Sequence, residues 1–161
     1  MRIYIIGFMG SGKSTYGKQL ASSIGYSFVD LDLLFEKEYR TTVFDFFENH
    51  SEEEFREKES LLLRQTHLLT NTIISLGGGT PCFQNNMDWI LENGICIYLK
   101  LSPKALLHRL LNSKKKRPLL KNILSEDLLS FIEDMLTKRE VFYQRAHLTL
   151  PAIDLKKTKI I

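Results

Sequence analysis

Several residue types that mark secreted, membrane-bound or metal-binding proteins are scarce in this sequence. Only two of the 161 residues are cysteines, and Cys82 and Cys96 stand apart, without the paired spacing of a zinc site or a disulfide framework. This usage is typical of a reducing cytoplasm. The apolar runs are far shorter than the roughly 18 residues that a membrane span needs, and the N-terminal MRIYIIG lacks the length and cleavage site of a signal peptide. The sequence therefore predicts a cytoplasmic protein.

An excess of charge of one sign is also missing. Lysine and arginine together number 22 against 19 acidic residues, which gives a net charge of +3. Acidic and basic residues are interspersed, so the charge pattern does not indicate a nucleic-acid or membrane partner. With 43% hydrophobic residues and no linker rich in glycine, serine or proline, the chain is expected to form one domain with a full core.

Short apolar runs alternate with longer stretches of helical spacing. The apolar runs predict strands at 2–6, 27–29, 72–76, 95–100 and, more weakly, 147–150. Helices are predicted over 14–24, about 33–40, 52–69, 103–112 and about 127–145. Ser51 and Glu54 form a capping-box pattern at the start of the third of these helices. The alternation favours an α/β fold with a parallel sheet covered on both faces.

The segment GFMGSGKS, residues 7–14, matches the phosphate-binding loop pattern G-x-x-x-x-G-K-[ST]. It follows a predicted strand and precedes a predicted helix, which is the context that such a loop requires. Its glycines let backbone N–H groups converge on phosphate oxygens, and the helix N-terminus adds a positive dipole. We expect Lys13 to reach the β- and γ-phosphates and Ser14 to bind Mg²⁺. A chance glycine turn is the alternative.

The motifs that accompany this loop in other nucleotide-binding proteins are absent. The sequence has no D-x-x-G and no N-K-x-D, which a switch GTPase would carry. A small kinase is therefore favoured over a switch or a motor.

Residues 28–32 read F-V-D-L-D, with two aspartates separated by one leucine. If the chain stays extended, Asp30 and Asp32 point to the same side. The strand should end beside the phosphate loop, so Asp30 is expected to support Mg²⁺, whose charge offsets the repulsion between the carboxylates. Asp32 is expected to orient an acceptor hydroxyl and to take its proton. Capping of the next helix by either residue is an equally good reading of the spacing.

The stretch Gly77–Gly78–Gly79 follows the third predicted strand. Three glycines there either allow close backbone approach or form a tight turn, and the turn is the more common case. Arg56 and Arg139 lie in predicted helices, where a single arginine is most often a solvated surface charge. Arg117, in K-K-K-R-P-L-L, lies in a basic segment between helices that resembles a lid over phosphates, although Lys114 to Lys116 also suit a solvated loop.

Taken together, these motifs make the chain similar to the shikimate kinase family. The resemblance runs from Arg2 to about Ala152. It depends on six motifs in order: GFMGSGKST, D-L-D, F-R-x-x-E at 55–59, GGG at 77–79, RPLL at 117–120, and R-x-x-x-Y at 139–143. Such an ordered set is highly specific.

The resemblance implies a three-layer P-loop NTPase fold, with a five-stranded parallel sheet flanked by helices. It implies a substrate-binding subdomain at 33–61 and a lid at 112–124. The implied reaction is ATP-dependent phosphorylation of the 3-hydroxyl of shikimate, in the shikimate pathway of chorismate and aromatic amino acid biosynthesis. The partners would be shikimate and ATP with Mg²⁺, without nucleic acid or membrane, and the protein would act as a monomer.

The resemblance also assigns residues. The ATP-binding set would be Gly10, Ser11, Gly12, Lys13, Ser14, Thr15 and Arg117, with Ser14 and Asp30 at the metal. The shikimate-binding set would be Asp32, Arg56, Gly77, Gly78, Gly79 and Arg139, and the catalytic set Lys13, Asp32 and Arg117. Val43, Phe47, Phe55, Pro118 and Leu119 would wall the ring faces, and Glu59 would hold Arg56 in place.

One departure from the family pattern concerns the adenine end. Leu110 stands where relatives carry an arginine near adenine, so Arg109 is a possible substitute. The loop at 152–156 is still expected to flank adenine.

Two other functions are compatible with the phosphate loop. Another small-molecule kinase, acting on gluconate or a nucleoside monophosphate, would share the phosphate loop. A nucleotide-binding regulator without transfer activity would be expected to lack Asp32 or Arg117, and both are present.

Overall fold

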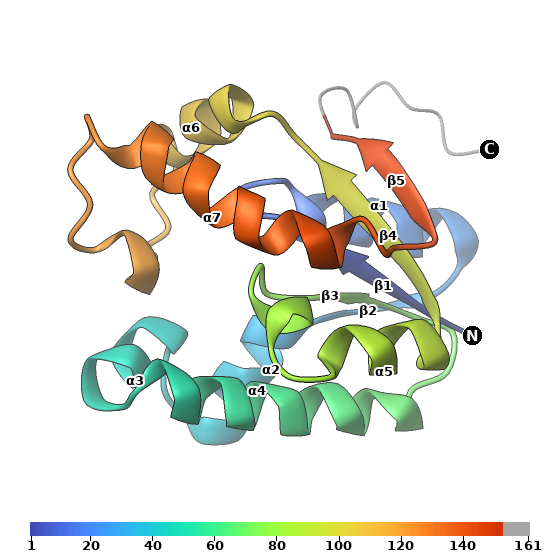
Figure 1. Cartoon of the computed structure of the whole chain (residues 1–161). Helices are drawn as coiled ribbons and strands as arrows, with labels where there is room; N and C mark the ends of the chain where they lie inside the picture. The colour runs from blue at the N-terminus through green and yellow to red at the C-terminus, as the bar shows by residue number, and fades with distance from the viewer. Residues whose placement is uncertain (153–161) are drawn as a thin grey trace.

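The computed structural model describes residues 1–152, which form a five-stranded sheet with helices on both faces (Figure 1). The strands are β1 (Arg2–Ile6), β2 (Ser27–Asp30), β3 (Thr72–Ser75), β4 (Ile95–Lys100) and β5 (Leu148–Pro151). Their order across the sheet is β2-β3-β1-β4-β5, and all neighbours pair in parallel. Parallel pairing places the carboxyl ends of all strands at one edge, where the loops that carry the sequence motifs meet.

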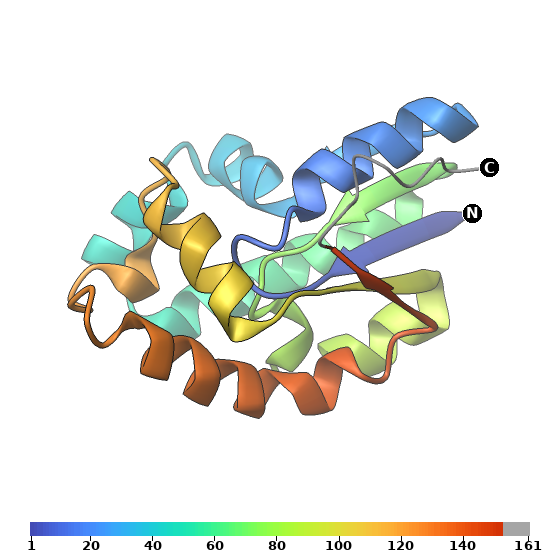
Figure 2. The same cartoon turned by 90° about the horizontal axis from the view of Figure 1, so that it is seen from above.

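Helices connect the strands and cover the sheet. They are α1 (Lys13–Ile24), α2 (Leu31–Tyr39), α3 (Val43–Asn49), α4 (Glu52–Gln65), α5 (Asn86–Asn93), α6 (Pro103–Leu111) and α7 (Leu128–Tyr143). Three 3₁₀ turns, η1 (Thr66–Leu68), η2 (Thr80–Cys82) and η3 (Pro118–Leu120), complete the connections. Seen from above, α1 lies on one face of the sheet, and α5 and α7 lie on the other (Figure 2). Helix α4 packs against α2 and α3, and α6 packs against α7.

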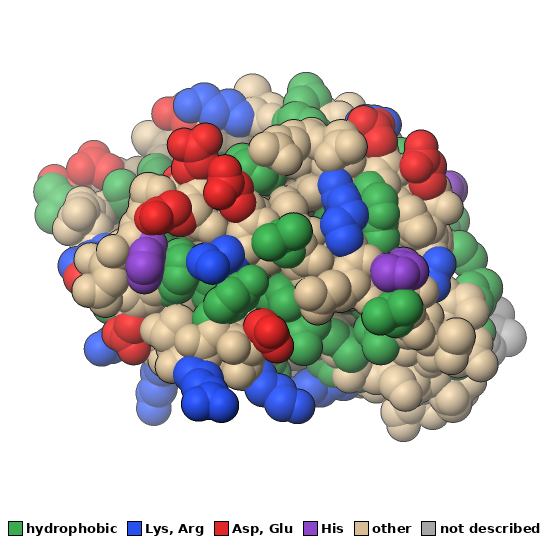
Figure 3. Space-filling view, turned by 90° about the horizontal axis from the view of Figure 1, so that it is seen from below, with side chains coloured by type: hydrophobic (Ala, Val, Ile, Leu, Met, Phe, Trp, Pro, Cys, Tyr) green, Lys and Arg blue, Asp and Glu red, His purple; other side chains and the backbone are tan. Residues whose placement is uncertain are grey.

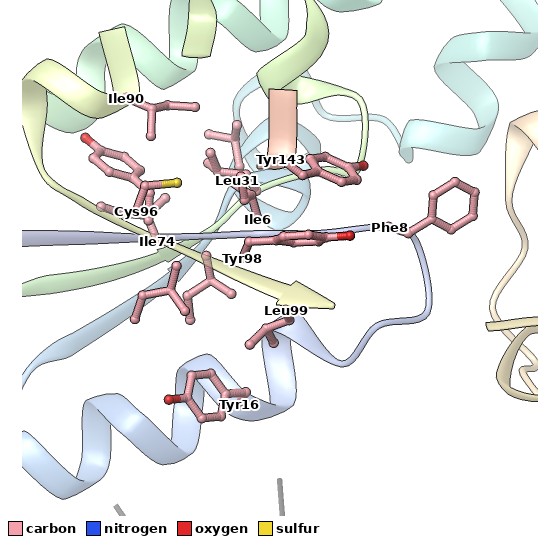
Figure 4. Close-up of a cluster of buried hydrophobic side chains, with 14 of the residues drawn as sticks. Ile6, Phe8, Tyr16, Leu31, Ile74, Ile90, Cys96, Tyr98, Leu99 and Tyr143 are labelled. Atoms are coloured by element: carbon pink, nitrogen blue, oxygen red, sulfur yellow. The ribbon is translucent and has the colours of Figure 1, made fainter. Parts of the chain in front are cut away.

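The central strands are buried on both faces, which explains their unbroken apolar sequence. In β1 the side chains of Tyr4, Ile5 and Ile6 have no exposed surface, and Ile73 and Ile74 of β3 are equally buried. Figure 4 shows Tyr16 of α1 below the sheet, with Ile90 of α5 and Tyr143 of α7 above it. The sheet is therefore the middle of three layers, which confirms the predicted fold class.

Most predicted elements are confirmed, with small shifts at their ends. β1 and β4 begin and end at the predicted residues, and the capping box is present: the Ser51 hydroxyl accepts from Glu54 N at 3.1 Å, and Glu54 Oε2 accepts from Ser51 N at 2.8 Å. The helix predicted over 52–69 ends at Gln65, where the Thr66 hydroxyl donates to the carbonyl of Leu63 at 2.6 Å and the chain tightens into η1. Helices α3 and α5 were not predicted.

The face seen from below carries both acidic and basic side chains, with hydrophobic ones between them (Figure 3). Within residues 1–152, no helix combines the length and the apolar character that crossing a membrane requires.

Candidate active site

A cleft of about 680 Å³ opens at the carboxyl edge of the sheet. The phosphate loop, α2, α3, α4, the GGG segment, the segment before η3, and α7 all contribute to its walls. A volume of this size is typical of sites that enclose small ligands. The motifs from distant parts of the sequence therefore meet in one place.

The phosphate loop has the backbone that its glycines were expected to allow. Gly10 and Gly12 have φ values of 81° and 93°, in the left-handed region that side chains disfavour. Lys13 Nζ donates to the carbonyls of Gly7 and Phe8 at 2.9 and 3.0 Å. Burial lowers the pKa of Lys13 to about 7, although nearby Asp32 opposes the shift. An approaching phosphate stabilises the charge of this buried ammonium more strongly than it would stabilise an ammonium at the surface.

Asp30 holds two groups at once. Its Oδ1 accepts from the backbone N–H groups of Asp32 and Leu33, at 3.0 and 3.4 Å, and so caps α2. Its Oδ2 accepts from the Ser14 hydroxyl at 2.5 Å. The capping reading is thus confirmed for Asp30, and the same carboxylate also contacts the loop serine. The expectation that the chain stays extended through Asp32 is wrong, because β2 ends at Asp30 and α2 begins at Leu31.

Asp32 lies in the first turn of α2 and lines the cleft. Burial raises the pKa of Asp32, and the neighbouring Asp30 raises it further. Lys115 Nζ lies 3.9 Å from Asp32 Oδ2 and favours the ionised form. A carboxylate whose pKa is moved upward is better suited to accept a proton than an ordinary surface aspartate.

Arg56 is buried in α4, contrary to the expectation for a single helical arginine, with only 8% of its surface exposed. Its Nη1 donates to Glu59 Oε1 at 2.8 Å, and its Nη2 lies 3.4 Å from Glu52 Oε1. Burial lowers the pKa of Arg56, but the carboxylates of Glu59 and Glu52 more than offset this and raise it. Glu59 in turn accepts from the Thr80 hydroxyl at 2.8 Å. The expected role of Glu59 as the support of Arg56 therefore has a direct geometric basis.

Glycine is required at these three positions because neighbouring side chains lie close to the backbone, and not only because the chain turns here. A Cβ on Gly78 would lie 3.0 Å from Arg139 Nη1, and a Cβ on Gly79 would overlap the guanidinium of Arg56. A Cβ on Gly77 would lie 2.9 Å from Glu59 Oε2 and 3.4 Å from Asp32 Oδ1. Without side chains in this segment, two guanidinium groups lie directly against the backbone at the floor of the cleft.

Arg139 projects from α7 and is also buried, with 8% of its surface exposed. Its guanidinium lies 5.5 Å from the centre of the Phe8 ring. Among the described residues, its Nη1 atom is buried without a hydrogen-bond partner. The expectation of a surface charge is wrong here too, because Arg139 is buried. A buried donor without a partner suits an anionic ligand.

The segment predicted as a lid contributes to the wall of the cleft. Arg117 lines the cleft, and burial lowers its pKa while the charge of Asp32 opposes the shift. Lys121, just after η3, pairs with Glu48 of α3 at 2.6 Å. Phe44 of α3 lies under the ammonium groups of Lys116 and Lys121, at 5.6 and 5.9 Å from the ring centre. These contacts hold the segment against α3.

Apolar side chains form one wall of the cleft. All five residues expected to face a ring are present there: Val43, Phe47, Phe55, Pro118 and Leu119. The ring of Phe55 packs against that of Phe47 at 4.7 Å between centres.

Arg109 is tied to backbone oxygens. Its Nη1 donates to the carbonyl of Ser11 at 3.0 Å, and its Nη2 donates to the carbonyl of Ala152 at 2.9 Å. The guanidinium thus links the phosphate loop to the end of β5, although it also lines the cleft. The loop at 152–156, expected beside adenine, lies outside the described residues apart from Ala152.

The structure brings every predicted site residue except Ser11 to the wall of the cleft. Ser11 is fully buried within the phosphate loop. Sequence reasoning missed Lys115 and Thr80. Thr80 follows GGG directly, and Lys115 is two residues before Arg117, so proximity to the motifs was the available signal.

Comparisons with known proteins point to one family. A family model described as shikimate kinase matches residues 9–160. The shikimate kinase of Parabacteroides distasonis is 42% identical over 151 residues, which are 94% of this chain and 87% of that protein. A crystal structure of the shikimate kinase from Bacteroides thetaiotaomicron aligns with a TM-score of 0.89 at 37% identity, covering 94% of this chain and 86% of the other. The shikimate kinase from Acinetobacter baumannii in complex with shikimate aligns with a TM-score of 0.85 at 31% identity, covering 92% and 82%.

Proposed function

This chain belongs to the shikimate kinase family, and from that premise we propose how its cleft performs the family's reaction. The protein is a kinase that uses ATP as co-substrate and transfers the γ-phosphoryl to the 3-hydroxyl of shikimate. The reaction is a step of the shikimate pathway. The assignment of residues to the two substrates is our proposal.

ATP binds by its phosphates at the loop from Gly10 to Thr15. The positive φ values of Gly10 and Gly12 and the N-terminus of α1 support this placement, because they direct backbone N–H groups and a helix dipole to the same spot. Lys13 exchanges its two carbonyl acceptors for phosphate oxygens. The negative charge of the phosphates then favours the protonated ammonium and offsets the burial that lowers the pKa of Lys13.

Ser14 and Asp30 are the proposed protein contacts of Mg²⁺. Their hard oxygen atoms, already 2.5 Å apart, are of the type that Mg²⁺ prefers. Within residues 1–152, no group of three or more His, Cys, Asp or Glu side chains could hold a metal by itself. Ser14 and Asp30 would therefore hold such an ion only together with the nucleotide. When bound, the ion neutralises charge on the β- and γ-phosphates.

Shikimate binds over the GGG segment, with its carboxylate toward Arg56 and Arg139. One observation carries this proposal: two guanidinium groups, each 8% exposed, lie against Gly79 and Gly78 and line the same cleft. A guanidinium binds a carboxylate in bidentate fashion. The apolar wall that includes Phe55 and Leu119 suits the faces of a carbon ring, and Asp32 suits its hydroxyls.

Transfer depends on Asp32 and Arg117. Asp32 accepts the proton of the 3-hydroxyl while that oxygen forms a bond to the γ-phosphorus. The bond from this phosphorus to the bridging oxygen breaks, and ADP leaves with the electron pair. Lys13 and Arg117 stabilise the charge on the transferring group. The raised pKa of Asp32 and the position of Arg117 in the cleft wall support these roles.

The segments 33–61 and 112–124 are the proposed substrate-binding subdomain and lid, which close together and exclude water. The pairing of Lys121 with Glu48 supports a joint movement. We propose that the enzyme acts as a monomer, since one chain supplies both the phosphate loop and the GGG segment to the cleft. We place it in the cytoplasm because Cys82 and Cys96 are both free thiols.

The proposal is tested by ADP release in a coupled assay with ATP and Mg²⁺, in the presence of shikimate, quinate or gluconate. Release should depend on shikimate and should be lost in Asp32→Ala. Release with gluconate in preference to shikimate, or normal turnover in Asp32→Ala, would overturn it. Tight ATP binding without release for any acceptor would instead favour the regulator.

A further inference from the structure

Tyr143, the last residue of the R-x-x-x-Y motif, touches the substrate-binding backbone directly. It ends α7, has no exposed surface, and its hydroxyl donates to the carbonyl of Gly78 at 2.5 Å. Burial raises the pKa of the Tyr143 hydroxyl, so it keeps its proton and remains a donor. Tyr143 has no role in the proposed phosphoryl transfer.

The carbonyl of Gly78 shares its peptide plane with the N–H of Gly79. In a trans peptide these two groups point in opposite directions, and the structure has no cis peptide bond among its described residues. Fixing the oxygen of Gly78 therefore fixes the direction of the Gly79 amide. Within residues 1–152, the amides of Gly77, Gly78 and Gly79 donate no hydrogen bond, while all three glycines line the cleft.

The hydrogen bond to the Gly78 carbonyl comes from the same helix that supplies Arg139. The two residues are four apart on α7, so they share a face. Arg139 Nη1 lies 3.0 Å from the position of a Cβ on Gly78, and Tyr143 holds the oxygen of the same residue. One face of α7 thus sets both the guanidinium and the peptide beside it.

A second buried tyrosine, on the sheet, provides a matched comparison for Tyr143. Tyr98 of β4 packs against Tyr143 with ring centres 5.0 Å apart, and its hydroxyl donates to Glu140 of α7 at 2.7 Å. Glu140 also pairs with Lys100 at 2.9 Å. Figure 4 shows the two rings close together, with both hydroxyl oxygens on the side of Phe8. Both hydroxyls are hydrogen-bonded, but only that of Tyr143 contacts the GGG segment.

We propose that Tyr143 is a positioning residue for shikimate, because its hydroxyl orients the Gly78–Gly79 peptide so that the Gly79 amide donates to the substrate carboxylate beside Arg56. The inference rests on the proposed placement of shikimate over GGG. Tyr143 does not touch the substrate. It acts through the backbone, and its loss should weaken shikimate binding without affecting the ATP end of the cleft.

The test compares Tyr143→Phe with Tyr98→Phe in the full chain. Each variant keeps the ring and removes one buried hydroxyl, so both should lose similar thermal stability. Tyr143→Phe should raise the KM for shikimate about tenfold, with kcat and the KM for ATP changed by less than about twofold. Tyr98→Phe should leave all three constants near those of the wild type.

The outcomes separate the inference from the proposed function. If the wild type turns over shikimate and Tyr143→Phe keeps its KM, or if the two variants raise it equally, Tyr143 is only structural and the inference is wrong. If the wild type does not phosphorylate shikimate, the proposed function fails and the inference fails with it. Should Tyr143→Phe be unstable, calorimetric titration of its folded fraction with shikimate measures the same change in affinity.

Discussion

Replacing Gly79 with alanine would isolate the contact between the GGG segment and Arg56. Gly79 has φ −93° and ψ −11°, a conformation that alanine adopts without strain. The added Cβ would lie only 2.6 Å from the guanidinium carbon of Arg56. The substitution therefore acts on the arginine and not on the backbone.

The size of the effect follows from the overlap. Ordinary contacts with a Cβ begin at 3.4 Å, and Arg56 Nη2 would lie closer still than the guanidinium carbon. The guanidinium must therefore retreat by about 1 Å in a packed site that cannot simply expand. Arg56 is held at 2.8 Å by Glu59, which limits its freedom to move. A charge-assisted hydrogen bond to a ligand is worth about 1.5–3 kcal/mol, so a misplaced guanidinium should raise the KM for shikimate about 10- to 100-fold.

Steady-state kinetics with each substrate varied in turn would measure this effect. The KM for ATP should stay unchanged, because the phosphate loop is separate from Gly79. In an Arg56→Met background, Gly79→Ala should have little further effect, since the clashing group is gone. An unchanged KM for shikimate in Gly79→Ala, or full additivity with Arg56→Met, would refute the reasoning.

Four further outcomes are expected. Lys13→Met should lower kcat about 100-fold or more by removing the cation at the transferring phosphate, and near-normal turnover would contradict that role. Arg139→Met should raise the KM for shikimate more than that for ATP; the reverse would place Arg139 at the nucleotide. Arg117→Met should lower kcat about 100-fold with little change in shikimate affinity measured by calorimetry. Excess EDTA should stop turnover and Mg²⁺ should restore it, whereas activity in EDTA would exclude the proposed site at Ser14 and Asp30.

The parallel sheet could be predicted from the sequence because its signal is local. A strand buried on both faces reads as an apolar run, and RIYII and ICIYLK gave the limits of β1 and β4 without error. The phosphate loop was equally predictable, since its glycines have a fixed spacing and a fixed context. Short helices gave no such signal: α3 has seven residues and α5 has eight, with no side-chain cap on the latter.

The burial of the site arginines could not be predicted from local pattern. Arg56 is stabilised by Glu59, and Glu59 by Thr80, which is 21 residues away. Such long-range contacts turn a typical surface residue into a buried one, and only the family resemblance pointed to them. The same holds for Asp32, because its position depends on where β2 ends and α2 begins, and the ends of elements are set by capping contacts such as those of Asp30.

The most direct test of the account is a ³¹P NMR spectrum of the wild-type protein incubated with ATP, Mg²⁺ and shikimate. The account predicts a phosphomonoester signal coupled to the ring proton at carbon 3, growing with the ADP signals and absent when shikimate is omitted. ADP and inorganic phosphate as the only new species, or an ester at another hydroxyl, would contradict the placement of Asp32, Arg56 and Arg139 around the substrate.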